Sequence, residues 1–153
     1  MRRSEKEIKD KEILKSLLGK AKICRIALSE DNKPYIIPMN FGFKDDCLYL
    51  HSANKGRKIE ILRKNNHICF EIDLKTELIK APEPCNWSMR YYSVIGFGKA
   101  AFIENIKGKI EALDLIMAKY APDQTFEYQK SMVDDLVILK VQITELTGKK
   151  SGY

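Results

Sequence analysis

The chain has 153 residues, of which 44% are hydrophobic, and a formal net charge of +6 at pH 7. This length allows one well-buried core and is too short for two, so we predict a single domain over residues 1–153. There is no recognisable signal peptide and no apolar run near the ~18 residues of a membrane span, so we expect a cytoplasmic protein with no membrane partner. The positive charge favours anionic partners, among them a phosphorylated cofactor or a nucleic acid, without choosing between them.

The four cysteines are far apart in the sequence and include no C-x-x-C pair. Three of them, Cys24, Cys47 and Cys69, lie in apolar runs that are typical of strands. We therefore expect free thiols in a reducing compartment and no metal site.

The first segment predicts an amphipathic helix. Ser4 and Glu7 have the spacing of a capping box, and apolar residues follow at helical intervals. Gly19 can end this helix, which we interpret as structural.

The next two segments predict a β-hairpin. Residues 23–28 form a nearly continuous apolar run, and residues 35–43 follow after a turn and alternate in polarity. One face of the second strand is unusual for a core strand, because it carries Pro38, Asn40 and Gly42. This strand is therefore expected at an edge, with a bulge, or lined by something other than a neighbouring strand.

The stretch 48–62 combines a strand with the start of a helix. Residues 47–51 alternate in polarity and would complete a meander of three strands. Ser52 or Asn54 could then cap a helix that continues to about residue 64.

The start of this helix has an unusual charge. Lys55, Arg57 and Lys58 lie in its first turn, where the helix dipole is positive and acidic residues are expected. An anion would relieve this conflict, and Gly56 would let the backbone approach a phosphate closely. The alternative is a solvated basic helix whose side chains point into water, and these residues alone do not decide between the two.

The middle of the chain predicts a strand and a surface connection. Residues 67–73 alternate cleanly between apolar and polar positions. Residues 75–86 contain two prolines and no sustained period, so we interpret them as a surface connection. Cys85 and Trp87 are the apolar residues expected to anchor it.

The last third predicts a long strand, a helix and a final strand. Residues 90–103 read as one strand in which Gly96 and Gly98 share a face, which indicates tight curvature or close backbone approach. A helix that Pro122 ends comes next. Residues 136–143 form the last predicted strand, and the tail from residue 148 is expected to be frayed.

These elements predict a mainly β fold with flanking helices (α+β), arranged as an antiparallel barrel with the helices outside it. Three blocks of sequence are then familiar in combination: residues 24–41, 48–73 and 90–100. The most specific motif is a strand followed by H-S-A-x-x-G-R-K at residues 51–58. Together the blocks resemble the pyridoxamine 5'-phosphate oxidase-like family of FMN-binding split β-barrel proteins, and most closely its nitroimidazole-resistance branch.

The resemblance implies an FMN site at the interface of a homodimer. In one subunit the implied cofactor-binding residues are Ile37, Pro38, Met39, Asn40, His51, Ser52, Arg57 and Lys58. From the second subunit they are Trp87, Tyr91 and Ser93. Arg57 and Lys58 would hold the flavin phosphate with the help of Ser52, which favours the anion-site interpretation of the first turn. His51 would lie near the edge of the flavin ring and is the candidate catalytic residue, with a hydrogen-bonded surface imidazole as the alternative.

Several residues also have simpler interpretations. Glu71 and Asp73 share a strand face and are expected to meet solvent or a cation. His67 and Cys69 share that face too, with no third ligand or orienting acid in evidence, so they predict no metal site and no nucleophile. Trp87 could simply anchor its loop.

The leading functional hypothesis is an FMN-dependent reductase or oxidoreductase of the nitroimidazole-resistance type, acting on a small, flat, reducible molecule. The oxidase's C-terminal pattern of arginine and histidine is missing, so we do not expect oxidation of pyridoxamine phosphate. One alternative is a non-catalytic carrier of flavin or haem. Another is a small basic barrel that binds nucleic acid, for which residues 90–92 would be cited. The last is less favoured, because basic and acidic residues are interspersed along the chain.

Overall fold

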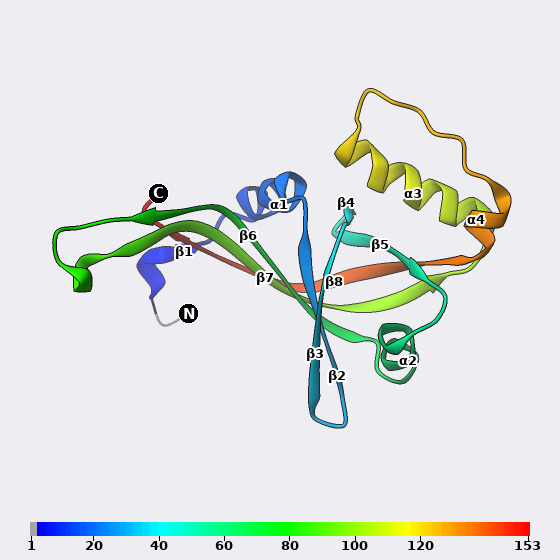
Figure 1. Cartoon of the computed structure of the whole chain (residues 1–153), viewed down its shortest axis with the longest axis horizontal. Coiled ribbons are helices and arrows are strands. Elements are labelled where there is room, and N and C mark those ends of the chain that lie inside the picture. The colour runs from blue at the N-terminus through cyan, green and yellow to red at the C-terminus, as the bar shows by residue number, and fades with distance from the viewer. Residues whose placement is uncertain (1–2) are drawn as a thin grey trace.

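The computed structural model describes residues 3–153 and contains one curled antiparallel sheet with helices around it (Figure 1). The strands are β1 (Glu7–Ile8), β2 (Cys24–Glu30), β3 (Lys33–Met39), β4 (Gly42–Lys44), β5 (Cys47–Ala53), β6 (His67–Ile79), β7 (Ser88–Ile103) and β8 (Leu136–Ser151). The helices are η1 (Ser4–Lys6), α1 (Lys11–Lys20), α2 (Arg57–Lys64), η2 (Pro84–Asn86), α3 (Ile106–Tyr120) and α4 (Lys130–Asp134). The strand order is β3-β2-β6-β7-β8-β5-β4, and β1 pairs with β8.

The two edge strands of this sheet, β3 and β4, are separated in sequence only by Asn40 and Phe41. The chain therefore passes directly from one edge of the curled sheet to the other, although no strand pairing closes the sheet within the described residues 3–153. This arrangement confirms the predicted split β-barrel with flanking helices. The side chains of Phe41, Phe70, Leu48 and Leu50 are fully buried inside it.

The prediction of one continuous strand over residues 35–43 was wrong, because β3 ends at Met39 and β4 begins at Gly42. Between them, the amide of Phe41 donates a hydrogen bond to the Tyr120 hydroxyl (3.1 Å) instead of joining a strand ladder. Helix α3 covers the break: a Cβ at Gly42 would lie 2.2 Å from Leu115 Cδ2. Here the strand face with Gly42 is lined by a helix, one of the options that the sequence left open.

The prediction of a three-stranded meander was also wrong. β2 and β3 do form a hairpin, with Leu28 opposite Tyr35, but β5 pairs with β4 on one side and with β8 on the other. The break between β3 and β4 is the reason, since it moves the chain to the opposite edge of the sheet before β5 begins.

The glycines of β7 lie where the sequence predicted close contacts. A Cβ on Gly96 would lie 2.3 Å from Cζ of Phe70, so this aromatic ring rests directly on the backbone. A Cβ on Gly98 would lie 2.4 Å from the Gln142 carbonyl oxygen, and the register between β7 and β8 shifts at the same place. Both positions therefore require glycine for close approach, as predicted.

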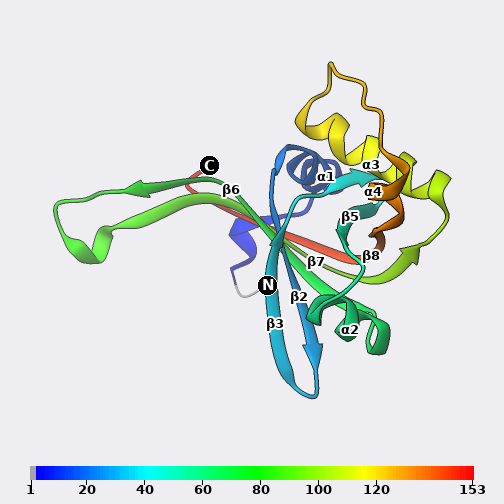
Figure 2. The ribbon, with the colours of Figure 1, turned by 45° about the vertical axis from the view of Figure 1, so that its right-hand side comes forward.

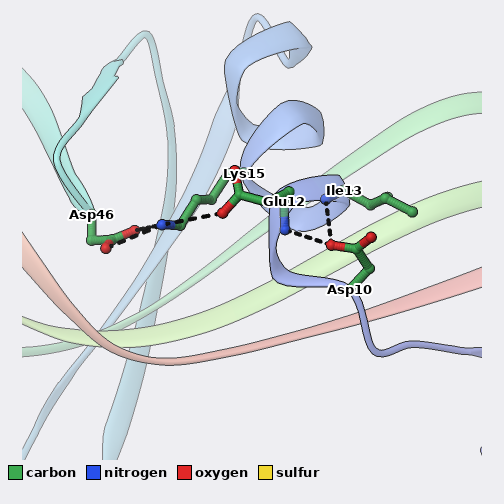
Figure 3. A network of polar contacts seen from close by, with 5 residues as sticks. All are labelled: Asp10, Glu12, Ile13, Lys15 and Asp46. Atoms are coloured by element: carbon green, nitrogen blue, oxygen red, sulfur yellow. Dashed lines mark hydrogen bonds and ion pairs between the residues drawn. The ribbon is translucent and has the colours of Figure 1, made fainter.

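Helix α1 begins later than the capping box predicts. The Asp10 carboxylate accepts hydrogen bonds from the amides of Glu12 (2.8 Å) and Ile13 (3.4 Å), as Figure 3 shows. Residues 4–8 instead form η1 and β1, and pairing of Glu7 and Ile8 with β8 satisfies backbone groups that a helix would otherwise use. Lys15 then links α1 to the β4–β5 turn through Asp46 (3.1 Å; Figure 3). No helix within residues 3–153 is long and apolar enough to cross a membrane.

β6 and β7 extend past the body of the sheet as a two-stranded ribbon, residues 75–91, that we call the arm (Figures 1 and 2). The predicted surface connection was wrong for residues 75–79, which continue β6 after a register shift. The tail predicted to be frayed is also strand, since Gly148 pairs with Val94 on one side and Ile8 on the other. The alternating pattern is weak in the arm because both of its faces are largely exposed, so no apolar face stands out in the sequence.

Candidate functional site

Helix α2 begins without any side-chain cap. Its N-cap residue is Gly56, whose φ of 109° favours glycine, while Ser52 lies inside β5 and Asn54 precedes the helix. The prediction that Ser52 or Asn54 caps this helix was therefore wrong. Arg57 and Lys58 are its first two residues, and their amides have no acceptor inside the helix. The helix dipole and these free amides make this end of α2 attractive to an anion.

The two cations at this helix end contact β3 rather than acids. The Arg57 guanidinium lies over the Tyr35 ring, 4.8 Å from its centroid. Lys58 Nζ lies 3.7 Å from Met39 Sδ, and burial lowers the pKa of its ammonium group. No carboxylate in residues 3–153 lies within ion-pair distance of either side chain. The far end of α2 differs, because Lys64 pairs there with Glu30.

His51 and Ser52 are consecutive residues of β5, so their side chains point to opposite faces of the strand. Ser52 is buried, whereas His51 keeps part of its ring in solvent. Burial of the rest of the ring lowers the pKa of His51, and the nearby positive charge of Lys58 lowers it further. The lowered pKa favours the neutral imidazole, which can donate one hydrogen bond and accept another.

The predicted flavin-facing residues of β3 divide between two faces. Met39 is buried against Lys58, and Ile37 packs against the main core. Pro38 and Asn40 point outward and are exposed. The structure thus brings Met39, His51 and Lys58 together, with Pro38 and Asn40 on the outer face of the same edge.

The residues that the resemblance assigned to a second subunit lie on or next to the arm, on the opposite side of the molecule from α2 (Figures 1 and 2). A single chain does not bring them near Arg57 and Lys58. Trp87 anchors its own loop as predicted, because its indole N–H donates to the Ala81 carbonyl (2.8 Å). Cys85, the second expected anchor, is exposed and does not pin the connection down.

Tyr91 and Ser93 lie on one outward face of β7, and Trp87 immediately precedes the strand in the same alternation; we call the odd-numbered residues from 87 to 97 the β7 face. Successive odd-numbered positions share this face, since side chains alternate along a strand. Its exposed apolar members are Trp87 (46%), Met89 (43%), Ile95 (41%) and Phe97 (48%). Two pairs of exposed apolar side chains, one on each side of the half-buried Tyr91 and Ser93, are typical of an interaction surface.

A shallow groove of about 680 Å³ crosses the outer side of the sheet beside the β7 face. Its floor includes Ala27, Cys69 and Phe97, which are register partners on β2, β6 and β7. Sequence analysis missed this groove. Each strand's alternation showed which residues point outward, but the register that places these three in one row is set by long-range pairing.

The sequence predicted that Glu71 and Asp73 of β6 meet either solvent or a cation, and in the structure they meet a cation. The Arg25 guanidinium on β2 pairs with both Glu71 (3.0 Å) and Asp73. Elsewhere in residues 3–153, His, Cys, Asp and Glu side chains form no group of three or more that could hold a metal ion.

Comparisons with known proteins identify the family and the fold. A family model described as pyridoxamine 5'-phosphate oxidase matches residues 10–150. The structure is similar to that of a proposed 5-nitroimidazole antibiotic resistance protein from Bacteroides thetaiotaomicron VPI-5482, with 38% sequence identity and a TM-score of 0.84 over 94% of this chain and 85% of that chain. No curated protein matches the sequence.

Two more distant structures share the fold. One is the flavocytochrome Anf3 from Azotobacter vinelandii, with 20% identity and a TM-score of 0.88 over 100% of this chain and 72% of that chain. The other is an FAD and heme binding protein from Mycobacterium smegmatis, with 21% identity and a TM-score of 0.87 over 97% of this chain and 74% of that chain. At these identities the likeness concerns the fold alone. The match over residues 10–150, together with the 38% identical structure, shows that the chain belongs to the pyridoxamine 5'-phosphate oxidase family.

Proposed function

We propose that the protein binds FMN at the start of α2, between two copies of the chain, and acts as a flavin-dependent oxidoreductase of the nitroimidazole-resistance type. The observation that carries this proposal is a pair of cations without an anion. Arg57 and Lys58 lie beside free helix amides, and neither has a carboxylate within ion-pair distance in residues 3–153. A dianionic phosphate supplies the missing charge and accepts from those amides.

The surroundings of this pair support a bound flavin rather than free phosphate alone. Met39 and Tyr35 already contact the two cations, so an aromatic ligand whose phosphate is held here can extend along β3. β3 is an edge strand, with Pro38 and the following Asn40 exposed, so a flat ring can lie against this edge. The similar protein from Bacteroides thetaiotaomicron, a proposed nitroimidazole-resistance protein, supports a small, flat, reducible substrate such as a nitroaromatic compound.

The second copy of the chain is proposed because one copy leaves both halves of the site open. The β7 face exposes Trp87 and Phe97, and the residues assigned to the partner's site, Tyr91 and Ser93, lie in the same row. Covering this face with another copy would bury apolar side chains and bring the row to the partner's flavin. Sedimentation is expected to show a dimer, and a flavin-loaded monomer at micromolar concentration would contradict this part of the proposal.

FMN, when bound, supplies the electron or hydride transfer chemistry, and the residues of this chain supply binding and orientation. Arg57 and Lys58 hold the phosphate, and Met39 keeps the Lys58 side chain in place. The lowered pKa of His51 favours its neutral form, which can hydrogen-bond a ligand at the end of β5 without adding a charge. The cysteines lie on separate elements as free thiols, which supports a cytoplasmic location.

The test changes Arg57 and Lys58 to alanine together and measures the affinity for FMN and for riboflavin. Each charge-assisted contact is worth about 1.5–3 kcal/mol, so we expect FMN binding to weaken by roughly 3–5 kcal/mol, about two to four decades in Kd. Riboflavin lacks the phosphate and should lose little further affinity. The double variant Arg63→Ala/Lys64→Ala is the matched control, because it removes the same charge from the opposite end of α2.

Equal losses of FMN and riboflavin affinity, or unchanged FMN affinity in the Arg57/Lys58 variant, would show that the phosphate does not bind at this helix end. Turnover is tested separately, by following reoxidation of the reduced, flavin-loaded protein by a nitroaromatic compound. Tight FMN binding without such reoxidation would favour a carrier over an enzyme.

A further inference from the structure

The arm leaves the body of the sheet at a joint in β6. The register between β6 and β7 shifts between Leu74 and Glu77, and Lys75 within the shift has a φ of 52°, a left-handed conformation uncommon for a residue with a side chain. The pairing of β7 with β8 ends at the same level, where Tyr91 lies opposite Ser151. Beyond this level the arm is a ribbon of two strands, which is marginally stable without further contacts.

Tyr153 contacts both sides of this joint. Its ring stacks on that of Tyr92, with 4.6 Å between centroids and an interplanar angle of 14°. Its hydroxyl donates a hydrogen bond to the carbonyl oxygen of Lys75 (2.8 Å), the residue in the left-handed conformation. The guanidinium of Arg90, on the arm, lies 5.2 Å from the centroid of the Tyr153 ring. The chain reaches this position through Gly152, whose φ is 73°.

The position of Arg90 against Tyr153 leaves one polar atom of Arg90 without a hydrogen bond. Arg90 Nη1 pairs with Glu77 (3.2 Å), but Arg90 Nε is buried and is the only buried side-chain nitrogen or oxygen in the described part of the chain without a hydrogen-bond partner. Leaving such a donor unpaired is unfavourable, and the stacking of its guanidinium against Tyr153 offsets part of that cost. Side-chain packing at the joint therefore supplements the pairing of β6 with β7, which is interrupted between Leu74 and Glu77.

The tip of the arm has its own internal contacts. Trp87 is fixed to Ala81, and Asn86 Nδ2 donates to the Glu83 carboxylate (3.1 Å). A rigid tip on a two-stranded ribbon leaves the joint as the place where the direction of the arm can change. Both views show the end of β8 lying beside the base of the arm (Figures 1 and 2).

We propose that Tyr153 is a positioning residue: it braces the joint, fixes the direction of the arm, and so places Trp87 against the flavin site of the partner. This inference rests on the proposed function for its last step. Without the brace the arm would sample several directions, and the apparent Kd for FMN rises in inverse proportion to the fraction of arms correctly placed. If about one arm in ten remains in place, the affinity falls about tenfold.

The test uses Trp87 as its probe, because it is the only tryptophan in the sequence. Time-resolved fluorescence anisotropy of the flavin-free protein is compared among wild type, Tyr153→Ala, Tyr153→Phe and Lys150→Ala. We expect Tyr153→Ala to add a large nanosecond component to the anisotropy decay. Tyr153→Phe keeps the ring stack and should restore most of the wild-type decay. Lys150, exposed on β8 near the joint, is the control and should change nothing.

FMN titration of the same proteins tests the second step. Tyr153→Ala should bind FMN about tenfold more weakly than wild type, with Tyr153→Phe close to wild type. Unchanged anisotropy in Tyr153→Ala would overturn the brace, and changed anisotropy with unchanged FMN affinity would overturn its link to the flavin site. If wild type itself binds no flavin, the proposed function fails while the anisotropy still judges the brace. Circular dichroism checks that Tyr153→Ala is folded, which we expect because the side chain is partly exposed.

Discussion

Two partly or fully buried lysines of this protein, Lys109 and Lys58, differ in the polar contacts of their ammonium groups. Lys109 of α3 is only 7% exposed, and its ammonium group donates to the carbonyl oxygens of Val133 (3.0 Å), Asp134 (3.4 Å) and Leu136 (2.6 Å). Lys58 at the start of α2 is partly buried, and its only described polar contact is the Met39 sulfur at 3.7 Å. A thioether is a weak acceptor.

The difference teaches how a functional cation can be told from a structural one. Lys109 links α3 to the end of α4 and the start of β8, and the protein itself provides its acceptors. Lys58 lies where the helix dipole is already positive, and burial lowers the pKa of its ammonium group. A fold that buries an amine normally supplies its partners, so the missing partner of Lys58 is expected to come from a ligand.

The strongest way to test this contrast is to remove Lys109. Lys109→Met keeps most of the side-chain volume but leaves three carbonyl groups near the α4–β8 junction without their shared donor. We expect the free energy of unfolding to fall by about 2–4 kcal/mol, measured by chemical denaturation. The FMN affinity of the folded fraction should not change, because the junction lies away from α2.

Unaltered stability in Lys109→Met would mean that water replaces the ammonium group at little cost. The contrast with Lys58 would then lose its basis.

Lys58→Met should behave in the opposite way. The flavin-free variant is expected to be as stable as wild type or slightly more stable, since a positive charge leaves a positive helix end. FMN affinity should fall by about 1.5–3 kcal/mol, roughly 10- to 150-fold. Denaturation with and without a fixed excess of FMN measures both effects at once, because the bound ligand adds RT ln(1 + [L]/Kd) to the free energy of unfolding. A loss of stability in the flavin-free protein would instead identify Lys58 as a structural residue.

The sequence predicted the conflict between the positive helix end and its cations. It did not predict that Lys58 is partly buried against β3. Three cations beside a glycine at a helix start are visible in the sequence, whereas the contact between Lys58 and Met39 depends on how β3 ends. The end of β3 was predicted wrongly, because the alternation of side chains in the sequence continues through residues 35–43. In the structure the strand is interrupted at Asn40 and Phe41. The break depends on α3 and Tyr120, which are some eighty positions away in sequence.

Most strands were predictable because one of their faces is buried and the other is not. β6 and β7 of the body follow this rule, and the glycines of β7 were predicted at the correct positions. The arm and the last part of β8 do not follow this rule. In the arm, the reason is that both faces contact solvent. Capping was predicted at Ser4 and found at Asp10 for a similar reason: pairing of β1 with β8 is a tertiary contact that no local motif reports.

A third lysine, Lys119, has surroundings intermediate between those of Lys109 and Lys58, and it gives a pH-dependent test. Lys119 Nζ donates to the Leu18 carbonyl (2.9 Å) and lies 3.2 Å from the centroid of the Phe41 ring, next to the break between β3 and β4. Burial lowers the pKa of Lys119 to about 8 from its usual 10.5, opposed in part by the nearby Cys24. Between these two pH values the unfolded chain binds more protons than the folded one, so this lysine makes the free energy of unfolding rise with pH.

Cys24 acts in the opposite direction over a higher range. Burial raises the pKa of its thiol to about 12 from 9.0, so above pH 9 the folded protein binds more protons and stability falls. The contribution of Lys119 is therefore clearest between pH 8 and 9.

The measurement is a comparison of wild type with Lys119→Met by chemical denaturation at intervals from pH 7 to 10.5. We expect the variant to lose the part of the pH dependence that rises above pH 8, with a difference of about 1 kcal/mol over the range, reduced because the Lys119 side chain keeps some contact with water. Cys24→Ala is the matched control, since it should lose the decline above pH 9 and keep the rise that begins near pH 8. A parallel pair of curves for wild type and Lys119→Met would show that Phe41 and the Leu18 carbonyl hold the ammonium form as well as water does. Lys119 would then resemble Lys109, whose ammonium group has its acceptors within the protein. Lys58 would remain the lysine whose acceptor is expected to come from a ligand.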